Sequence, residues 1–181
     1  MAESTTSPII LRDALPEDAA PIAALGADIF TITFGHSVSQ KELSAFLTEH
    51  YSTASILADI INPAKSMIVA TDTSTNNKIV GFALLTRGSE EPCLAHLSDA
   101  VELQRLYVDV GFHGRGVGKL LEARMVGLAR EGGFGWLWLG VWEENDVALR
   151  VYGKLGYGKV GEHDFVIGEV VQRDLIMVKR I

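Results

Sequence analysis

The sequence contains a single cysteine, and this scarcity excludes several kinds of protein. With only Cys93 among 181 residues, no disulfide can form within the chain and no cysteine pair is available for a zinc site. The five histidines show no metal-ligand spacing, so we expect no metal. Cys93 follows Glu90-Glu91-Pro92, where negative charge disfavours a reactive thiolate. The cysteine usage favours a cytoplasmic location.

Long apolar runs and an excess of positive charge are also missing. The longest apolar runs, such as Ile79–Leu85, are much shorter than the roughly 20 residues that span a bilayer. The N-terminus lacks the basic and then apolar regions of a secretory signal. The net charge of −7 argues against nucleic acid as the main partner and is compatible with a small cationic substrate. We therefore expect neither a membrane nor nucleic acid among the partners.

The chain is long enough for one domain with a sizeable core. Its 181 residues are 48% hydrophobic and 22% charged, which is ordinary for a soluble globular protein. No internal repeat, low-complexity tract or linker divides the chain. We predict a flexible N-terminus over residues 1–7 and a single domain over residues 8–181.

Hydrophobic periodicity predicts the elements of the first half of the chain. The order is a strand, a helix that begins between Asp13 and Asp18, a loop, two helices and a β-hairpin. Ser39 with Glu42 three residues later forms a capping box, which begins the second helix. The remaining ranges are Pro8–Arg12 (strand), Thr31–Ser39 (loop), Ser55–Ile61 (third helix), and Ser66–Thr71 with Lys78–Thr86 (hairpin).

The second half of the chain alternates strands with helices and ends in an antiparallel strand pair. The order predicts an α/β or α+β fold, with a mixed sheet and helices on both faces. The predicted ranges are Ala100–Val108, Trp136–Trp142, Lys159–Gly168 and Val170–Arg180 (strands) and Asn145–Leu155 (helix), with a further helix after residue 116. The predicted core faces of these two helices are Val117, Leu120, Leu121, Met125 and Leu128, and Val147, Ala148, Val151 and Leu155.

The turn that follows the strand ending at Val108 has the composition of an anion-binding site. Four glycines, at positions 111, 114, 116 and 118, lie between this strand and the N-terminus of a helix. Free N–H groups and the helix dipole favour an anion there, and Arg115 and Lys119 add positive charge. The spacing lacks the third glycine of a dinucleotide motif and the G-K-[S/T] of a P-loop. We predict a phosphorylated ligand at this turn.

The strand before this turn carries a carboxylate. Period-two alternation predicts one face with Glu102, Gln104, Leu106 and Val108 and the other with Leu103, Arg105 and Tyr107. A carboxylate on a half-buried strand is unfavourable unless it is paired or functional. Glu102 is therefore either one half of a structural ion pair or a group that accepts a proton from an amine.

A helix near residue 150 places three further residues on one face. Asn145, Ala148 and Tyr152 lie three and four residues apart, so their side chains point the same way. An asparagine can cap a helix, and a tyrosine hydroxyl can act as a general acid. Taken alone, the pattern is also compatible with a cap and a core position.

Together these motifs resemble those of the GNAT N-acetyltransferases. Residues 113–118 match the pyrophosphate loop Q/R-x-x-G-x-G/A, with His113 where Gln or Arg is usual. A second motif, V-x-x-x-N-x-x-A-x-x-x-Y-x-x-x-G-F/Y, is matched between Val141 and Tyr157 at every anchor. Residues 160–168 and 172–177 resemble the C-terminal strands of the PaiA-type spermidine/spermine acetyltransferases, and Thr33-Phe34 is similar to their loop after the first helix. The resemblance covers nearly the whole chain.

The resemblance implies a single GNAT-like domain with a mostly antiparallel sheet and a splayed strand pair that holds acetyl-CoA. It assigns Glu102 as general base and Tyr152 as general acid, and it places Glu102, Gln104 and Phe34 beside the substrate. The residues that it implies for cofactor binding are Leu106, Tyr107, Val108, His113, Gly114, Arg115, Gly116, Val117, Gly118, Lys119, Asn145 and Tyr152.

The implied reaction is transfer of the acetyl group of acetyl-CoA to a small primary amine by direct attack in a ternary complex. A polyamine such as spermidine or spermine is the favoured acceptor. One alternative is another amine, namely an amino acid, an aminoglycoside-like amine or a protein N-terminus. A second is a non-catalytic acyl-CoA-binding regulator, against which the intact Glu102, Asn145 and Tyr152 argue. The resemblance is also compatible with a homodimer.

His163 and Asp174, in the C-terminal strands, are interpreted as structural partners and not as catalytic residues.

Overall fold

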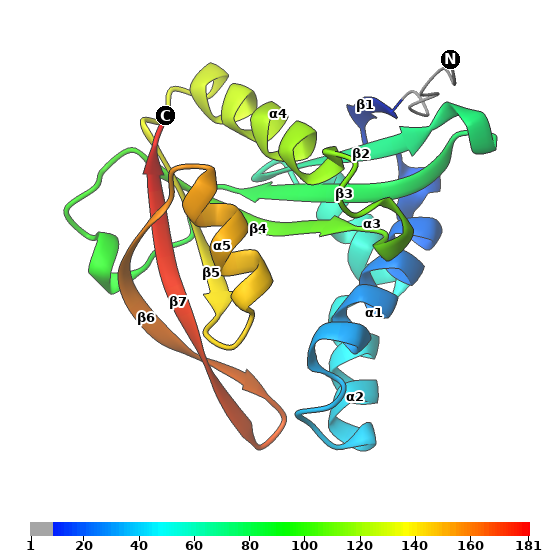
Figure 1. Cartoon of the computed structure of the whole chain (residues 1–181), viewed down its shortest axis with the longest axis horizontal. Helices are drawn as coiled ribbons and strands as arrows, with labels where there is room; N and C mark the ends of the chain where they lie inside the picture. Colours follow the sequence, from blue (N-terminus) through cyan, green and yellow to red (C-terminus); the bar gives the residue numbers. More distant parts are fainter. Residues whose placement is uncertain (1–8) are drawn as a thin grey trace, which may run out of the picture.

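The computed structural model of the protein describes residues 9–181, which form one mixed seven-stranded sheet covered by helices on both faces (Figure 1). The strand order is β1-β2-β3-β4-β5-β7-β6. The strands are β1 (Ile9–Asp13), β2 (Lys65–Asp72), β3 (Lys78–Thr86), β4 (Ala100–Val108), β5 (Trp136–Trp142), β6 (Gly158–Ile167) and β7 (Val170–Arg180). The helices are α1 (Ala19–Phe34), α2 (Gln40–His50), α3 (Thr53–Ile61), α4 (Val117–Glu131) and α5 (Asp146–Lys154).

This arrangement confirms the predicted fold class and the predicted element order. The capping box is present, since Ser39 Oγ accepts a hydrogen bond from the Glu42 N–H and the Glu42 carboxylate accepts one from the Ser39 N–H. The predicted flexible segment 1–7 and the predicted strand residue Pro8 lie outside the described residues.

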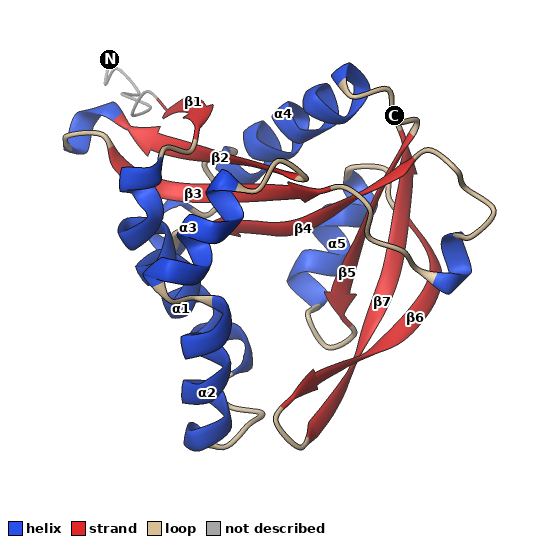
Figure 2. Ribbon diagram, turned by 180° about the vertical axis from the view of Figure 1, so that it is seen from behind, coloured by secondary structure: helices blue, strands red, loops and turns tan. Residues whose placement is uncertain are grey.

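At the centre of the sheet, β4 and β5 pair over fewer residues than any other two neighbouring strands. Strands β1 to β4 pair antiparallel with one another, as do β5, β7 and β6. Strands β4 and β5 run parallel and pair over three positions, the last of which joins Glu102 to Trp138. Beyond Glu102 the two strands separate, which is plain from behind the molecule (Figure 2).

Two of the three hydrophobic clusters in the described residues lie on opposite faces of the sheet. The core under α4 and α5 includes Leu121 and Met125 of α4 and Leu139 of β5, all of which are inaccessible to solvent. The core under α1, α2 and α3 includes Phe30 of α1 and Phe82 of β3. Figures 1 and 2 show α4 and the α1–α3 group on opposite sides of β2, β3 and β4.

Helix α1 is longer than the sequence pattern predicts. The predicted loop over Thr31–Ser39 is wrong at its start, because the helix continues to Phe34. The Thr33 hydroxyl bonds back to the carbonyl oxygen of Ile29 at 2.9 Å, and the ring of Phe34 packs on that of Phe30 with centroids 4.5 Å apart. Tertiary packing of Phe34 therefore offsets the low helix propensity of the threonines.

The predicted core faces of α4 and α5 are also partly wrong. Leu120 is 46% exposed, and Val147 and Val151 are 63% and 47% exposed. In α5, Leu149 and Tyr152 pack against the core instead of these valines. The buried face of α5 is therefore turned toward Leu149 and Tyr152, and Leu120 of α4 lies outside the buried face of its helix.

Strand β4 contains a β-bulge that breaks the predicted alternation. Leu103 pairs with Leu85 and Arg105 pairs with Leu84, so Gln104 is an extra residue on β4. Leu103 and Leu106 consequently both pack in the core under α4. The prediction that Glu102, Gln104, Leu106 and Val108 share one face is wrong beyond the bulge.

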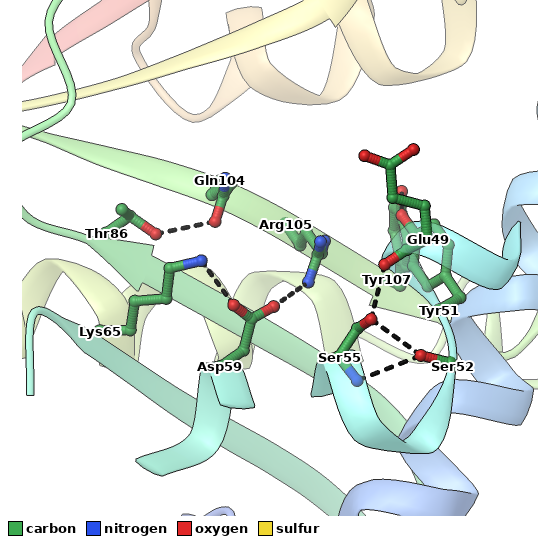
Figure 3. Close-up of polar contacts among 10 residues, drawn as sticks. All are labelled: Glu49, Tyr51, Ser52, Ser55, Asp59, Lys65, Thr86, Gln104, Arg105 and Tyr107. Atoms are coloured by element: carbon green, nitrogen blue, oxygen red, sulfur yellow. Dashed lines mark hydrogen bonds and ion pairs between the residues drawn. The ribbon is translucent and has the colours of Figure 1, made fainter. Parts of the chain in front are cut away.

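A buried ion triad lies next to this bulge (Figure 3). Asp59 of α3 accepts hydrogen bonds from Arg105 of β4 at 2.6 Å and from Lys65 of β2 at 2.5 Å. All three side chains are less than one-fifth exposed. The Arg105 guanidinium also lies 5.1 Å from the ring centre of Tyr51. The triad therefore ties α3 to two strands at the position where β4 changes register.

We predict that Asp59→Asn destabilises the protein, because it leaves Arg105 and Lys65 largely buried without a counter-charge. The free energy of unfolding should fall by about 3 kcal/mol, as measured by urea denaturation. The control, Glu131→Gln, breaks the more exposed pair with Arg124 and should change stability by less than about 0.5 kcal/mol. Equally small losses for both variants would contradict a stabilising role for the triad.

Candidate functional site

The glycine-rich turn joins the end of β4 to the start of α4 in a conformation that requires glycine. Gly114 and Gly116 have φ angles of 74° and 81°, in the left-handed region that L side chains rarely adopt. A Cβ atom at either position would have no heavy atom within 4 Å. The outer side of the turn is therefore open, so a ligand can approach its backbone.

Free hydrogen-bond donors face this open space. Across residues 9–181, no acceptor pairs with the backbone N–H groups of Val117, Gly118 or Lys119, and no side chain caps α4. Arg115, whose guanidinium lies 4.7 Å from the ring centre of Phe112, and Lys119 are both exposed. Unpaired N–H groups, the positive end of the helix dipole and two cations suit a pyrophosphate.

His113 has a different position from the glycines of the turn. Its Nε2 lies 2.9 Å from the carbonyl oxygen of Val108, and its backbone N–H donates to Val110 at 3.2 Å. Both groups are therefore engaged within the turn. His113 holds the turn against the end of β4, so its backbone N–H is less available to a phosphate than those of α4.

Beyond Glu102, the edge of β4 that faces β5 has no strand partner among residues 9–181, and β3 occupies the other edge. The side chains of Leu106 and Val108 pack toward α4, and a Cβ atom on Gly118 would lie 3.7 Å from each of them. The Tyr107 side chain points to the opposite face, where its hydroxyl lies 2.6 Å from that of Tyr51. This edge therefore presents backbone groups to an extended ligand.

Tyr152 and Asn145 are positioned by α5. The Asn145 side-chain oxygen accepts a hydrogen bond of 3.1 Å from the Ala148 N–H, which caps the helix. The Tyr152 ring packs edge-on against Tyr157, with centroids 5.6 Å apart, and its hydroxyl makes no hydrogen bond within the described chain. Burial, and secondarily the charge of Glu122, raise the pKa of Tyr152 to about 12. The hydroxyl thus keeps its proton at neutral pH.

Glu102 lies where β4 and β5 separate, and its carboxylate accepts a 2.5 Å hydrogen bond from the Ser89 hydroxyl. Burial raises the pKa of Glu102, and the Ser89 hydrogen bond and the charge of Lys65 only partly oppose this. The structural alternative, an ion pair with an arginine, is not found among residues 9–181. Glu102 is therefore a carboxylate with a raised proton affinity and no paired cation.

The other two predicted substrate contacts lie on the face opposite α4. The Gln104 side-chain oxygen accepts a hydrogen bond of 2.8 Å from the Thr86 hydroxyl (Figure 3). Gln104 is exposed, and its side-chain N–H groups have no partner among the described residues. The ring of Phe34 lies 5.2 Å from that of Trp142 and 6.0 Å from that of Phe165. Phe34 thus joins the end of α1 to the ends of β5 and β6.

In the structure, Glu91 joins His163 and Asp174, the two residues that the sequence analysis interprets as structural partners. His163 Nδ1 lies 2.5 Å from Glu91 Oε1, and His163 Nε2 lies 3.8 Å from Asp174 Oδ2. The charges of Glu91 and His163 both act on Glu102. No local signal could reveal this cluster, because Glu91 and His163 are 72 residues apart in the chain.

The described residues also lack two features that would bear on the site. They contain no group of three or more His, Cys, Asp or Glu side chains that could hold a metal ion. None of their helices is long and apolar enough to cross a membrane. Burial, and then the charge of Glu91, raise the pKa of the Cys93 thiol, in agreement with the predicted low reactivity.

An anion-binding turn, an unpaired strand edge and a protonated tyrosine are features that suit a group-transfer enzyme with an extended, pyrophosphate-containing cofactor. A family model described as the acetyltransferase (GNAT) family matches residues 29–157, more than half of the chain. The chain therefore belongs to the GNAT acetyltransferase family. It is an acyltransferase that uses acetyl-CoA, and the residues at the turn fit this cofactor.

Similar proteins share the fold across nearly the whole chain. An uncharacterized N-acetyltransferase of Mycobacterium tuberculosis is 29% identical over 164 residues, which cover 91% of this chain and 98% of that protein. The crystal structure of the PaiA N-acetyltransferase of Thermoplasma acidophilum with coenzyme A has a TM-score of 0.76 at 21% identity and covers 96% of this chain and 99% of that one.

A second similar structure shows that the fold alone does not define the acceptor. The ribosomal-protein-S18-alanine N-acetyltransferase of Escherichia coli has a TM-score of 0.67 at 17% identity, covering 96% of this chain and 94% of that one. Its name gives an acceptor different from a polyamine. The acceptor of this chain must therefore be inferred from its own residues.

We predict that alanine has opposite effects at two glycines of the site. Gly116→Ala should lower the free energy of unfolding by about 1 kcal/mol, because φ is positive there. Gly153→Ala should raise the free energy of unfolding by about 0.5–1 kcal/mol, because Gly153 lies inside α5 and an added Cβ atom would have no heavy atom within 4 Å. Chemical denaturation measures both changes, and equal signs would contradict the assigned conformation of the turn.

Proposed function

We propose that the protein acetylates a small primary amine of the polyamine class by direct attack while both substrates are bound. The observation that carries this proposal is Glu102, a carboxylate with a raised pKa and no paired cation at the separation of β4 and β5. An amine in its ammonium form supplies the missing charge there and must lose a proton before it can react. The net charge of −7 further supports a cationic acceptor.

Acetyl-CoA, when bound, supplies the acetyl group as a thioester. The free N–H groups of the turn and of the first turn of α4, together with Arg115 and Lys119, bind its pyrophosphate. The backbone edge from Leu106 to Val108 binds the pantetheine arm as an added strand would. Asn145 contacts the same arm through its amide nitrogen, since its oxygen caps α5.

Glu102 accepts a proton from the ammonium, directly or through water, and the freed nitrogen lone pair forms the new bond to the acetyl carbon. As that bond forms, the carbon–sulfur bond breaks and Tyr152 donates its proton to the departing sulfur. The acylated nitrogen then loses its second proton to solvent, Glu102 releases the first to solvent, and solvent returns a proton to Tyr152. Gln104 and Phe34 contact the acceptor on the face opposite α4. The homodimer and the cytoplasmic location stay predictions.

The test is thiol release from acetyl-CoA with spermidine, spermine, several monoamines, amino acids and a peptide with a free N-terminus. Turnover that is highest with the polyamines supports the proposal. Turnover restricted to amino acids or peptides would replace the proposed acceptor. Tight binding of coenzyme A without turnover on any amine would favour a non-catalytic acyl-CoA-binding protein and overturn the proposed reaction.

We predict that Tyr152→Phe lowers kcat about 100-fold, because the departing sulfur loses its proton donor. Since the pKa of Tyr152 is about 12, the wild-type rate should show no loss from Tyr152 ionisation up to about pH 10. The matched control is Tyr157→Phe, which removes a buried hydroxyl that donates to Glu122 at 3.2 Å and should affect stability more than kcat. An unchanged kcat for Tyr152→Phe would exclude the proposed proton donor.

We predict that Glu102→Gln lowers kcat/KM most at neutral pH, where the acceptor is charged, and least near pH 10, where it is increasingly deprotonated. In the wild type, activity should fall as the pH drops through a value above 4.5, because burial raises the pKa of Glu102. Steady-state rates across pH measure both effects. Glu131→Gln, which is distant in sequence and exposed, serves as the control. An equal loss at every pH would assign Glu102 a structural role.

A further inference from the structure

Two buried side-chain oxygens in the described chain lack a hydrogen-bond partner, and both belong to β7. They are Gln172 Oε1 and Asp174 Oδ1. Because the two residues are two positions apart on one strand, their side chains point to the same face of the sheet. A buried acceptor without a donor is unfavourable. Because the two oxygens lie on one strand and one face and both need a hydrogen-bond donor, they point to a single donor group that is supplied by a ligand.

The orientation of Gln172 is fixed by its neighbours. Only 9% of the residue is exposed, and its Nε2 donates to Ser37 Oγ at 2.6 Å. The Ser37 hydroxyl donates its own proton to the carbonyl oxygen of Phe34 at 2.7 Å. Ser37 therefore cannot donate to Gln172, and a flipped amide would bring two acceptors together. The amide oxygen is thus the atom left for an outside donor.

Asp174 lacks a counter-charge of its own. Its pairing partners are Trp142 on β5 and His163 on β6. The nearest basic atom is His163 Nε2 at 3.8 Å, which is too far for a hydrogen bond, and His163 Nδ1 already contacts Glu91 at 2.5 Å. Burial raises the pKa of Asp174 to about 6. At neutral pH this carboxylate is charged and only weakly compensated.

Gln172 also lines a cleft whose charged side chains are mostly acidic. The cleft, of about 330 Å³, lies between the turn after α1, the turn after β5 and the β6–β7 hairpin. Its charged side chains are Glu143, Glu144, Asp164 and Arg173, and the Arg173 guanidinium pairs with Glu162 at 3.2 Å. This balance disfavours an acceptor that carries a carboxylate near its amine.

We propose that Gln172 and Asp174 form a subsite for a second cationic nitrogen of the acceptor, separate from the amine that reacts beside Glu102. This inference rests on the proposed function and narrows it to acceptors with at least two amino groups. An ammonium supplies N–H donors to both unpaired oxygens and positive charge to Asp174. Glu102 pairs with Trp138 and Asp174 pairs with Trp142, four positions further along β5, so the subsite and the reacting position lie along the same strand.

The test compares 1,4-diaminobutane with 1-aminobutane, two acceptors that share one carbon chain and differ in the second nitrogen. The wild type should prefer the diamine in kcat/KM by about tenfold or more. Asp174→Asn and Gln172→Met keep the shapes of the side chains and should each lower kcat/KM for the diamine about tenfold more than for the monoamine, mainly through KM. The control is Glu131→Gln, which removes one exposed negative charge at the end of α4 and should leave the preference intact.

A purely structural role of Asp174 gives a different result. In that case Asp174→Asn would lower the unfolding temperature and reduce the rates with both amines equally, which would overturn the proposal. A wild type without preference for the diamine would also overturn it.

If no amine is acetylated, the proposed function fails and the subsite is tested by calorimetry. The titrant is 1,4-diaminobutane, added to the complex of the protein with coenzyme A. Binding that Asp174→Asn and Gln172→Met weaken about tenfold would support the subsite without the reaction. Absent binding, or binding that neither variant changes, would overturn it.

Discussion

The arrangement of the site depends on how little β4 and β5 pair. They share a parallel ladder of three residue pairs, which ends at Glu102 and Trp138. A longer ladder would satisfy the backbone groups of β4 and leave no edge for a ligand. Because the strands separate instead, the unpaired edge leads from Glu102 to the glycine-rich turn. Glu102 therefore lies at one end of this edge, and the proposed pyrophosphate site lies at the other.

Two features hold β4 in this position while the edge stays open. The bulge at Gln104 changes which side chains face α4, so Leu103 and Leu106 both enter the same core. Beside it, Asp59 binds Arg105 and Lys65 and connects α3 to the strands. A buried ion triad is weak evidence for net stability, but losing one member is costly. In this structure the triad holds β4 to α3 and β2 directly after the bulge.

Positive groups lie at the glycine-rich turn, and acidic groups lie at the opposite end of the proposed site. Arg115, Lys119 and the free N–H groups of α4 make the turn attractive to anions. The opposite face of the sheet gathers Glu91, Glu102 and Asp174. Among the described residues, His163 lies 2.5 Å from Glu91 and 3.8 Å from Asp174, and the charge of Lys65 acts on Glu102. Burying such groups without a partner is unfavourable in the free protein. A cationic acceptor would relieve this cost when it binds, which links affinity to the charge of the substrate.

The sequence by itself determined the features that depend on neighbours a few residues away. The capping box of Ser39, the two strands of the hairpin, the glycine-rich turn and the cap at Asn145 are fixed by local hydrogen bonds and backbone conformations. Tertiary structure decided the rest: the bulge at Gln104, and the meeting of Glu91 with His163 across 72 residues. Strand register and long-range contacts depend on how distant segments pair and pack, which no short pattern in the chain encodes.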